Sequence, residues 1–202
     1  MVDIHSIPNI GKNPLQYVFE DLKTLDNDNN LWLEFGVYKG ITINFFSKFT
    51  NNKVYGFDSF EGLPEDWRPN FPRKRFHMHG KLPEVNKNVE LVIGLFQNTL
   101  KPFLKKINGK KKSFLHIDCD IYSSTNYILD NIYEHLDKKC IIVFDDFVNY
   151  RGYEEGELKA FIEFVKKNNV KYKWIGMNGT ILDEIPEREN SYYQKVALQL
   201  DM

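Results

Sequence analysis

The sequence predicts an α/β fold: a doubly wound, mostly parallel sheet of seven strands that ends in an antiparallel hairpin. Five short runs rich in apolar and β-branched residues alternate with helical patterns, which is typical of a parallel sheet with helices on both faces. Two more strand candidates close the chain, joined by a polar stretch rather than a helix. The expected strands are 31–35, 53–57, 90–93, 113–117, 140–144, 171–175 and 194–200.

Apolar residues at helical spacing mark the elements between these strands. Near the N-terminus, Pro14 suits a first helical turn, so residues 1–30 are expected to form a helical lead-in that packs on the sheet. Two later stripes predict helices with one apolar face. The three stripes are Leu15, Val18, Phe19, Leu22 and Leu25; Ile128, Leu129, Ile132, Tyr133 and Leu136; and Leu158, Phe161, Ile162 and Val165.

Two segments fit no regular element, namely residues 61–89, rich in Pro, Gly and basic side chains, and residues 178–193. Loops of this length in a compact domain are usually functional lids or disordered. We expect 61–89 to form a lid over the substrate, and we assign no role to 178–193. A chain of 202 residues, 42% of them hydrophobic, suits one domain spanning 1–202 rather than two.

The charge balance argues against a large anionic partner. The chain has 27 basic and 28 acidic residues, so no overall cationic field attracts a nucleic acid or a membrane. We find no signal segment and no stretch of about 20 apolar residues that could span a bilayer. Cys119 and Cys140 lie within apolar runs, which suits buried reduced thiols better than a secreted disulfide. We therefore expect a cytoplasmic protein with a small-molecule substrate.

A turn with two glycines follows the first expected strand. Gly36 and Gly40 would let the backbone pass close to a ligand, and Thr42 is positioned to cap the next helix. About twenty residues later Asp58 ends the second strand, where a carboxylate can accept both hydroxyls of a ribose. Each feature alone also fits a plain strand-to-helix junction or a helix cap. Together they favour an adenosine-containing ligand beyond the carboxyl ends of the strands.

Four carboxylates follow the fourth and fifth expected strands. Asp118 and Asp120 are two residues apart, so an extended chain would project them from one face, while Asp145 and Asp146 follow the fifth strand. A right-handed crossover would gather all four at one rim of the sheet. Because like charges repel, the cluster needs a cation, a proton or basic partners to compensate it, and its oxygen ligands suit Mg²⁺ or Ca²⁺ better than Zn²⁺. The alternative is that each Asp caps a helix or lies in a solvated loop.

Histidines and aromatic residues supply further candidates. His77 and His79 lie two residues apart in the basic part of the expected lid, where they suit either a lid-borne site or a solvated loop. His116 precedes the first acidic pair on its strand, as a neighbour of the cluster or as a core residue. Trp67 and Tyr150 present aromatic faces that can stack on a sugar ring.

The combined motifs resemble those of class I S-adenosylmethionine-dependent methyltransferases, and specifically the macrocin O-methyltransferase (TylF/MycF-like) family, which modifies sugar hydroxyls. The resemblance covers most of the chain from about Leu31 onward. It implies a Rossmann-like class I methyltransferase fold with S-adenosylmethionine as the cofactor. The runs that carry it are LEFGVYKGITINFF, VYGFDSFEGLPEDW, GLFQNTL, HIDCDIYSST, FDDF and KVALQL.

The resemblance also implies roles for individual residues. The methionine moiety of the cofactor is expected at the glycine turn, the ribose on Asp58, and the adenine after the third strand. The implied cofactor-binding residues are Glu34, Gly36, Tyr38, Gly40, Thr42, Asp58, Ser59, Phe60, Phe96 and Gln97.

The acidic cluster receives its roles from the same resemblance. The resemblance implies that Mg²⁺ is held by Asp145, Asp146 and a member of the Asp118 and Asp120 pair. The remaining carboxylate of that pair would take the proton of the acceptor, and we favour Asp118 as this base. A divalent ion on the acceptor hydroxyl lowers its pKa and orients it for in-line methyl transfer. The expected substrate contacts are Trp67, His79, Tyr122 and Tyr150.

Sequence alone leaves more than one function open. We favour a Mg²⁺-assisted O-methyltransferase of a sugar or sugar-containing metabolite. The alternative is a metal-dependent phosphoryl-transfer or hydrolytic enzyme, because paired aspartates also hold the metals of phosphatases, although that chemistry needs neither the glycine turn nor Asp58. A third reading is a silent adenosine-binding domain. We expect no macrolide acceptor, because the longer N-terminal extension of antibiotic-tailoring members is missing, and we expect a homo-oligomer, because such enzymes often complete their sites across subunits.

Overall fold

A seven-stranded sheet forms the centre of the protein, in a computed structural model that describes residues 2–22, 25, 30–106, 113–137, 139–187 and 190–201. The strand order is β3-β2-β1-β4-β5-β7-β6. Neighbours from β3 through β5 pair in parallel, whereas β7 pairs antiparallel with both β5 and β6. The strands are β1 (Leu31–Phe35), β2 (Val54–Asp58), β3 (Val89–Ile93), β4 (Ser113–Ile117), β5 (Ile141–Phe144), β6 (Tyr172–Met177) and β7 (Val196–Leu200). The expected mostly parallel sheet with a C-terminal hairpin is confirmed.

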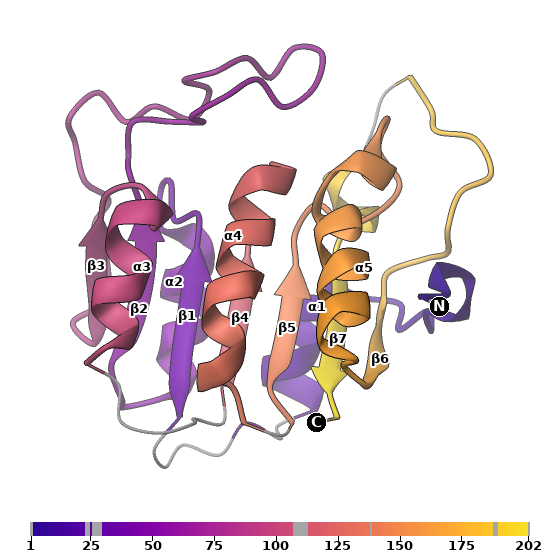
Figure 1. Cartoon of the computed structure of the whole chain (residues 1–202), viewed down its shortest axis with the longest axis horizontal. Helices are drawn as coiled ribbons and strands as arrows, with labels where there is room; N and C mark the ends of the chain where they lie inside the picture. Colours follow the sequence, from indigo (N-terminus) through magenta and orange to yellow (C-terminus); the bar gives the residue numbers. More distant parts are fainter. Residues whose placement is uncertain are drawn as a thin grey trace.

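Helices cover both faces of this sheet (Figure 1). One face carries α3, α4 and α5, and the other carries α1 and α2. Each layer buries its own group of apolar side chains against the strands. The central strands β1, β4 and β5 are therefore buried along their whole length, as expected for strands enclosed on both faces. The helices are α1 (Pro14–Gln16), α2 (Ile41–Phe46), α3 (Phe96–Leu104), α4 (Tyr122–Ile132) and α5 (Glu157–Asn168).

The N-terminal lead-in is helical, as its spacing predicts. A short 3-10 turn, Ile4–Ser6, comes first, and α1 continues directly into a π-helical segment, Tyr17–Leu22. Its apolar side chains join the core on the α2 face. Backbone hydrogen bonds also tie this region to the edge strand β6, because Ile10 N–H donates to the Met177 carbonyl at 2.8 Å. The rest of the expected lead-in, residues 23–24 and 26–29, lies outside the described residues.

One expected helix cap is wrong. The N-cap of α2 is Gly40, with a φ of 75°, and no side chain caps the helix. Thr42 instead lies inside α2, one residue after the first. The cause is the glycine itself, because its left-handed backbone starts the helix two residues before the threonine. The two cysteines, Cys119 and Cys140, are buried and free, as expected.

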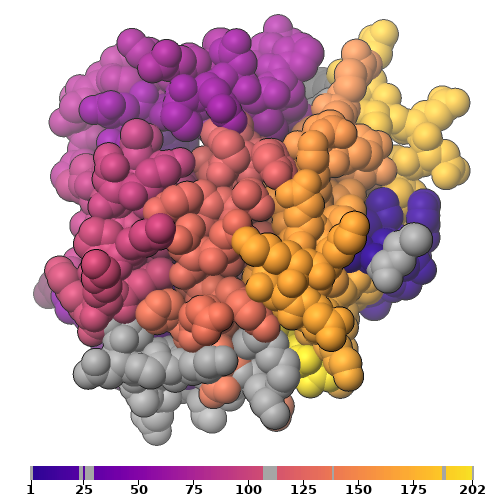
Figure 2. All heavy atoms as spheres, in the orientation of Figure 1, coloured from indigo at the N-terminus to yellow at the C-terminus, as the bar shows by residue number. Residues whose placement is uncertain are grey.

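The segment between β2 and β3 has no helix or strand, and it passes over the edge of the sheet where the parallel strands end (Figures 1 and 2). We call residues 61–88 the lid, since the last residue of the range expected from sequence, Val89, begins β3. Turns and an isolated bridge between Arg68 and Phe71 give the lid its shape. Among the described residues, no helix combines the length and the apolar character that crossing a bilayer would require.

Candidate active site at the carboxyl edge of the sheet

The tips of the parallel strands remain in register beyond the last strand residues. Gly36 N–H donates to the Phe57 carbonyl at 2.9 Å, and Asp118 N–H donates to the Phe35 carbonyl at 2.8 Å. Asp145 N–H likewise donates to Ile117 at 2.9 Å. The loops that follow β1, β2, β4 and β5 therefore start from one rigid edge, which is where open α/β sheets bind ligands.

Gly36 is required by the close approach of β1 and β4. Its φ is 94°, and a Cβ atom built on it would lie 1.7 Å from the carbonyl oxygen of Asp118. Any side chain would therefore push the tip of β4 away from the turn. The sequence predicts that Gly36 lets a ligand approach the backbone, and the structure shows that it also lets β1 and β4 pack closely.

Asp58 holds the glycine turn in place. One carboxylate oxygen accepts hydrogen bonds from the backbone N–H groups of Val37 at 2.9 Å and Tyr38 at 2.8 Å. The other oxygen accepts from Phe60 N–H at 2.7 Å. Hydrogen bonds of this charge-assisted kind are the stronger ones in proteins. The strand-end acid thus ties β2 to the loop after β1.

A pocket of about 140 Å³ lies above this edge. Its floor comes from the glycine turn, the ends of β2 to β4 and the start of α3, and its cover comes from the lid. Eight residues expected from sequence line it: Gly36, Tyr38, Asp58, Ser59, Phe96, Gln97, Asp118 and Asp120.

Four of the residues expected at the cofactor do not line this pocket: Glu34, Gly40, Thr42 and Phe60. Phe60 is buried in the core on the α2 face. Glu34 is fully buried below the floor, where its carboxylate lies 2.8 Å from Nδ1 of His116. Residues that alternate along β1 point to opposite faces of the sheet, so Glu34 faces α2 rather than the open edge.

Three of the four expected carboxylates come together in one group, but for a different local reason. One carboxylate oxygen each from Asp118, Asp120 and Asp146 lies within 4.8 Å of the others. The strand ends at Ile117, and Asp120 has a φ of 65°, so the extended-chain alternation expected for the first pair is wrong. A tight turn, closed by the 2.7 Å hydrogen bond from Ile121 N–H to the Cys119 carbonyl, directs the two carboxylates together.

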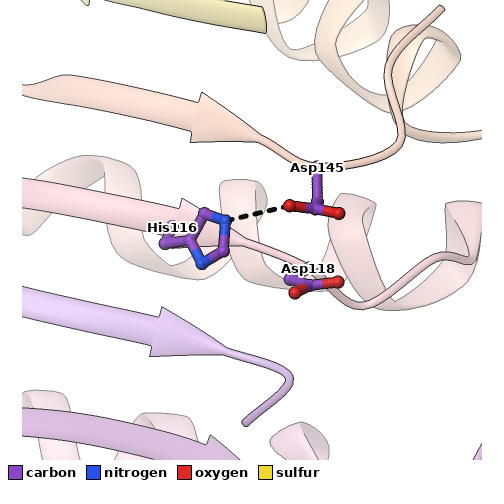
Figure 3. Close-up of side chains that lie close together, drawn as sticks. All are labelled: His116, Asp118 and Asp145. Carbon is purple, nitrogen blue, oxygen red and sulfur yellow. Dashed lines mark hydrogen bonds and ion pairs between the residues drawn. The ribbon is translucent and has the colours of Figure 1, made fainter. Parts of the chain in front are cut away.

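Two cations neutralise Asp145, namely the fully buried His116 and the partly buried Lys195, and the second was not expected. His116 and Asp145 point toward each other in Figure 3, with Nε2 of His116 3.3 Å from Oδ1 of Asp145. Lys195, just before β7, makes a short contact with the same oxygen. Burial alone would raise the pKa of Asp145, but the hydrogen bond with His116 and the charge of Lys195 lower it to about 2.

His116 is a buried imidazolium. Burial lowers its pKa, but the hydrogen bonds to Asp145 and Glu34 outweigh that effect and raise the pKa to about 10. The ring is fully enclosed, with Glu34 on one nitrogen and Asp145 on the other. Because both ring nitrogens then carry protons, His116 holds the two acids in position and offers no lone pair to a metal.

The remaining acids repel one another. Burial and the charge of Asp145 raise the pKa of Asp146 to about 7. A fifth carboxylate, Glu157 at the first residue of α5, is fully buried and accepts a hydrogen bond from Asp146 N–H at 3.2 Å. Burial and the charge of Asp146 also raise the pKa of Glu157 well above its usual range. This excess negative charge favours a bound cation.

Comparison with known proteins agrees with this geometry. A family model described as "Methyltransferase domain" (Methyltransf_24) matches residues 33–147, more than half of the 202-residue chain. The chain belongs to this methyltransferase family. The predicted class I methyltransferase and its Rossmann-like fold are thereby confirmed, whereas the narrower macrocin O-methyltransferase assignment stays a prediction. A search of curated proteins found no significant match.

Solved structures that resemble the methyltransferase include several O-methyltransferases. NovP is 19% identical, with a TM-score of 0.63 and coverage of 93% of this chain and 78% of that chain. Calicheamicin methyltransferase CalS11 is also 19% identical, with a TM-score of 0.63 and coverage of 92% and 76%. An O-methyltransferase from Bacillus cereus is 13% identical, with a TM-score of 0.56 and coverage of 99% and 84%. At these identities the likeness shows the fold.

The methyltransferase has a second cleft beside the acidic cluster, formed by the lid, the start of α4 and the loop after β5. Three of the four residues expected to contact substrate line it: Trp67, Tyr122 and Tyr150. The rings of Trp67 and Tyr150 meet edge to face at 5.6 Å. The guanidinium of Arg68 lies over both, 4.0 Å and 4.6 Å from their centroids. His79 lies apart from them, in another cleft that it shares with His77.

Sequence reasoning missed Lys195, Glu157 and Arg68 as residues of this site. Lys195 begins the run KVALQL, and only the pairing of β7 with β5 brings it to Asp145. Glu157 follows two other glutamates in a polar stretch that is typical of a solvated loop. Arg68 directly follows Trp67 in the sequence, and a cation next to a predicted aromatic substrate contact is a signal that could have identified it.

Proposed function

We propose that the protein is an S-adenosylmethionine-dependent O-methyltransferase that acts, with Mg²⁺, on a hydroxyl of a sugar or sugar-containing metabolite. The observation that carries this proposal is that Asp118 and Asp120 line the same pocket as the glycine turn and Asp58. A sulfonium bound above that turn would have its methyl group beside the acidic cluster. One structural neighbour, at a TM-score of 0.51, is described as a TDP-rhamnose 3'-O-methyltransferase, which supports a sugar acceptor.

The pocket residues suit the parts of the proposed cofactor. Phe96 and Gln97, at the start of α3, would take the adenine by stacking and by a polar contact. Asp58 would take the ribose, because each carboxylate oxygen accepts two hydrogen bonds and the one that binds Phe60 N–H has capacity left. Gly36 and Tyr38 would border the methionine moiety.

The donor set fits a divalent cation. Asp118, Asp120 and Asp146 supply only oxygen ligands, which Mg²⁺ prefers, and their mutual repulsion is relieved when a cation binds. Asp145 already pairs with Lys195 and His116, so we assign it to positioning rather than to the cation. Mg²⁺ held there would lower the pKa of the acceptor hydroxyl and orient it.

The protein's own groups would then carry out the transfer. The aromatic cleft of Trp67, Tyr122 and Tyr150 would hold the sugar ring next to the cluster. Asp118 is the less buried of the Asp118 and Asp120 pair, so we assign it as the carboxylate that takes the hydroxyl proton and assign Asp120 and Asp146 as the ligands of the cation. Alignment of oxygen, methyl carbon and sulfur would supply most of the rate enhancement.

Radiolabelled methyl transfer from S-adenosylmethionine to a panel of sugars and nucleotide sugars, with and without EDTA, tests the proposal. We expect transfer that EDTA abolishes and Mg²⁺ restores, and a loss of at least about a hundredfold in Asp146→Asn, the range of a mutated catalytic group. Asp130→Asn, which removes a surface carboxylate paired with Lys167, is the matched control. Transfer that is insensitive to EDTA would refute the metal, and failure to bind S-adenosylhomocysteine would refute the cofactor.

The competing functions have less support. The family match leaves no observation that favours a phosphoryl-transfer or hydrolytic enzyme. A homo-oligomer stays a prediction, to be checked by sedimentation.

A further inference from the structure

The pocket proposed for S-adenosylmethionine offers no cation to the carboxylate of that cofactor. Asp58, Asp118 and Asp120 line it, and the described residues of its wall include no Lys, Arg or His. Negative side chains suit the sulfonium and the ammonium of the cofactor, since opposite charges attract strongly at a partly buried site. They repel its carboxylate, which must therefore find its donors at the margin of the pocket.

The glycine turn has few donors left for this carboxylate. Free backbone N–H groups at such turns are the usual alternative to cations in binding an anion. Four N–H groups of this turn already donate within the protein: Gly36 to Phe57, Val37 and Tyr38 to Asp58, and Gly40 to Val37.

A basic cleft adjoins the pocket at the glycine turn. Tyr38 and Phe76 line both spaces, and their rings meet edge to face at 5.3 Å, so this pair is the partition between them. The other lining residues of the cleft all belong to the lid: Lys74, Arg75, His77 and His79. The cleft thus brings cationic side chains next to the turn where the methionine moiety would end, in addition to Lys39 of the turn itself, whose Nζ lies 5.1 Å from the ring centroid of Tyr38.

We propose that Lys74 and Arg75 of the lid bind the methionine carboxylate of S-adenosylmethionine, an inference that rests on the proposed function. Both side chains are exposed, and neither forms an ion pair within the described part of the chain. The guanidinium of Arg75 lies between two rings of the lid, 5.4 Å from the centroid of Phe71 and 5.6 Å from that of Phe76, and the second ring belongs to the partition.

The rest of the lid fits this role. Between positions 67 and 82 the sequence has no Asp or Glu, although the whole chain has a net charge of −1. Such a concentration of positive charge on one loop attracts an anion to that loop. Lys74 and Phe76 both have a φ of 68°, and non-glycine residues held in the left-handed region cluster at ligand clamps. Binding of the cofactor would therefore also fix the loop that covers the acceptor.

Calorimetry with two ligands tests the proposal. S-adenosylhomocysteine carries the carboxylate, and 5'-(3-aminopropylthio)-5'-deoxyadenosine is the same molecule without it. We expect the double variant Lys74→Ala/Arg75→Ala to bind S-adenosylhomocysteine about tenfold or more weakly, the usual size of a lost charged hydrogen bond. It should bind the decarboxylated analogue no more weakly than the unmodified protein does. The control Arg73→Ala/Lys81→Ala removes the same charge from the lid at positions that do not line the cleft, and should keep both affinities.

Each other outcome overturns the inference. Equal weakening toward both ligands would mean that the variant only disturbs the lid. Unchanged affinity for S-adenosylhomocysteine, with loss of methyl transfer to phosphate-bearing sugars but not to neutral ones, would mean that the two cations bind the acceptor instead. If the unmodified protein binds neither ligand, the proposed function itself fails, so the two failures are distinguishable.

Discussion

The buried pair of Glu34 and His116 should be essential for stability, and replacing the histidine alone should be costly. Glu34 Oε1 lies 2.8 Å from Nδ1 of His116, and both side chains are fully buried. His116→Phe preserves the ring but leaves the carboxylate without its cation. Breaking a buried pair from one side costs about 3–5 kcal/mol. For a domain of this size that corresponds to a fall of about 6–20 °C in Tm, at about 2–4 °C per kcal/mol.

Urea unfolding of four proteins checks this value. The proteins are the unmodified chain, His116→Phe, the double variant Glu34→Leu/His116→Phe, and the exposed control His5→Gln. The double variant should recover most of the loss, because apolar residues of similar volume often replace a buried ion pair at little cost. The control should change the free energy of unfolding by less than about 0.5 kcal/mol. A loss below about 1 kcal/mol in His116→Phe, or a double variant as unstable as the single one, would refute the reasoning.

The same pair predicts a pH dependence with a definite sign. The pKa of His116 is raised from 6.5 to about 10 in the folded protein, so the folded state holds a proton that the unfolded state releases. The stabilisation is fully present below pH 6.5 and is lost as the pH rises toward 10. The double variant lacks both titrating groups. The stability advantage of the unmodified chain over the double variant should therefore shrink across this window, and an advantage that grows with pH would contradict the assignment.

Three more predictions concern the acidic edge. Asp146→Asn should abolish Mn²⁺ binding measured by electron paramagnetic resonance, whereas Asp145→Asn should retain it, because the latter acid already has its own cations; equal losses would contradict this. Gly36→Ala should cost at least about 3 kcal/mol or prevent folding, because its Cβ would meet the Asp118 carbonyl at 1.7 Å; a stable, native-like variant in thermal denaturation would contradict it. Folding raises the pKa of Glu157, so the unmodified chain should lose stability as the pH rises above 4.5, whereas Glu157→Gln should not lose this contribution. The stability advantage of the variant should therefore grow with pH in urea unfolding, and parallel stability profiles of the two proteins would contradict the prediction.

Most of the fold could be predicted from the sequence because buried parallel strands are short, apolar and separated by helices. The limits of β1 and β4 match the expected runs residue for residue. Expected limits at the edge are less accurate, and β7 starts at Val196 rather than at 194, because Gln194 still belongs to the preceding 3-10 turn and donates its N–H to the Ser191 carbonyl. Local pattern determines burial, but the exact end of a strand depends on the turn that follows it.

The site was predictable only where its residues are close in sequence to a strand end. Gly36, Asp58 and Asp118 could be recognised because the carboxyl ends of parallel strands meet at one edge. The pairs that balance the charges could not be recognised, because Glu34 and His116 are far apart in the chain and Lys195 reaches Asp145 only through the antiparallel pairing of β7. The fully buried Glu157 contradicts the usual expectation that a glutamate in a polar stretch is exposed.

The position of Lys195, between β6 and β7 in the sequence, has a consequence for biosynthesis. A ribosome makes β1 to β5 first, so the acids after β4 and β5 are complete long before the lysine that balances one of them. Until β7 inserts between β5 and β6, the nascent protein has an unpaired strand edge, and Asp145 has only one of its two cationic partners, His116. The acidic centre of the enzyme therefore depends on the strand of the sheet that is synthesised last.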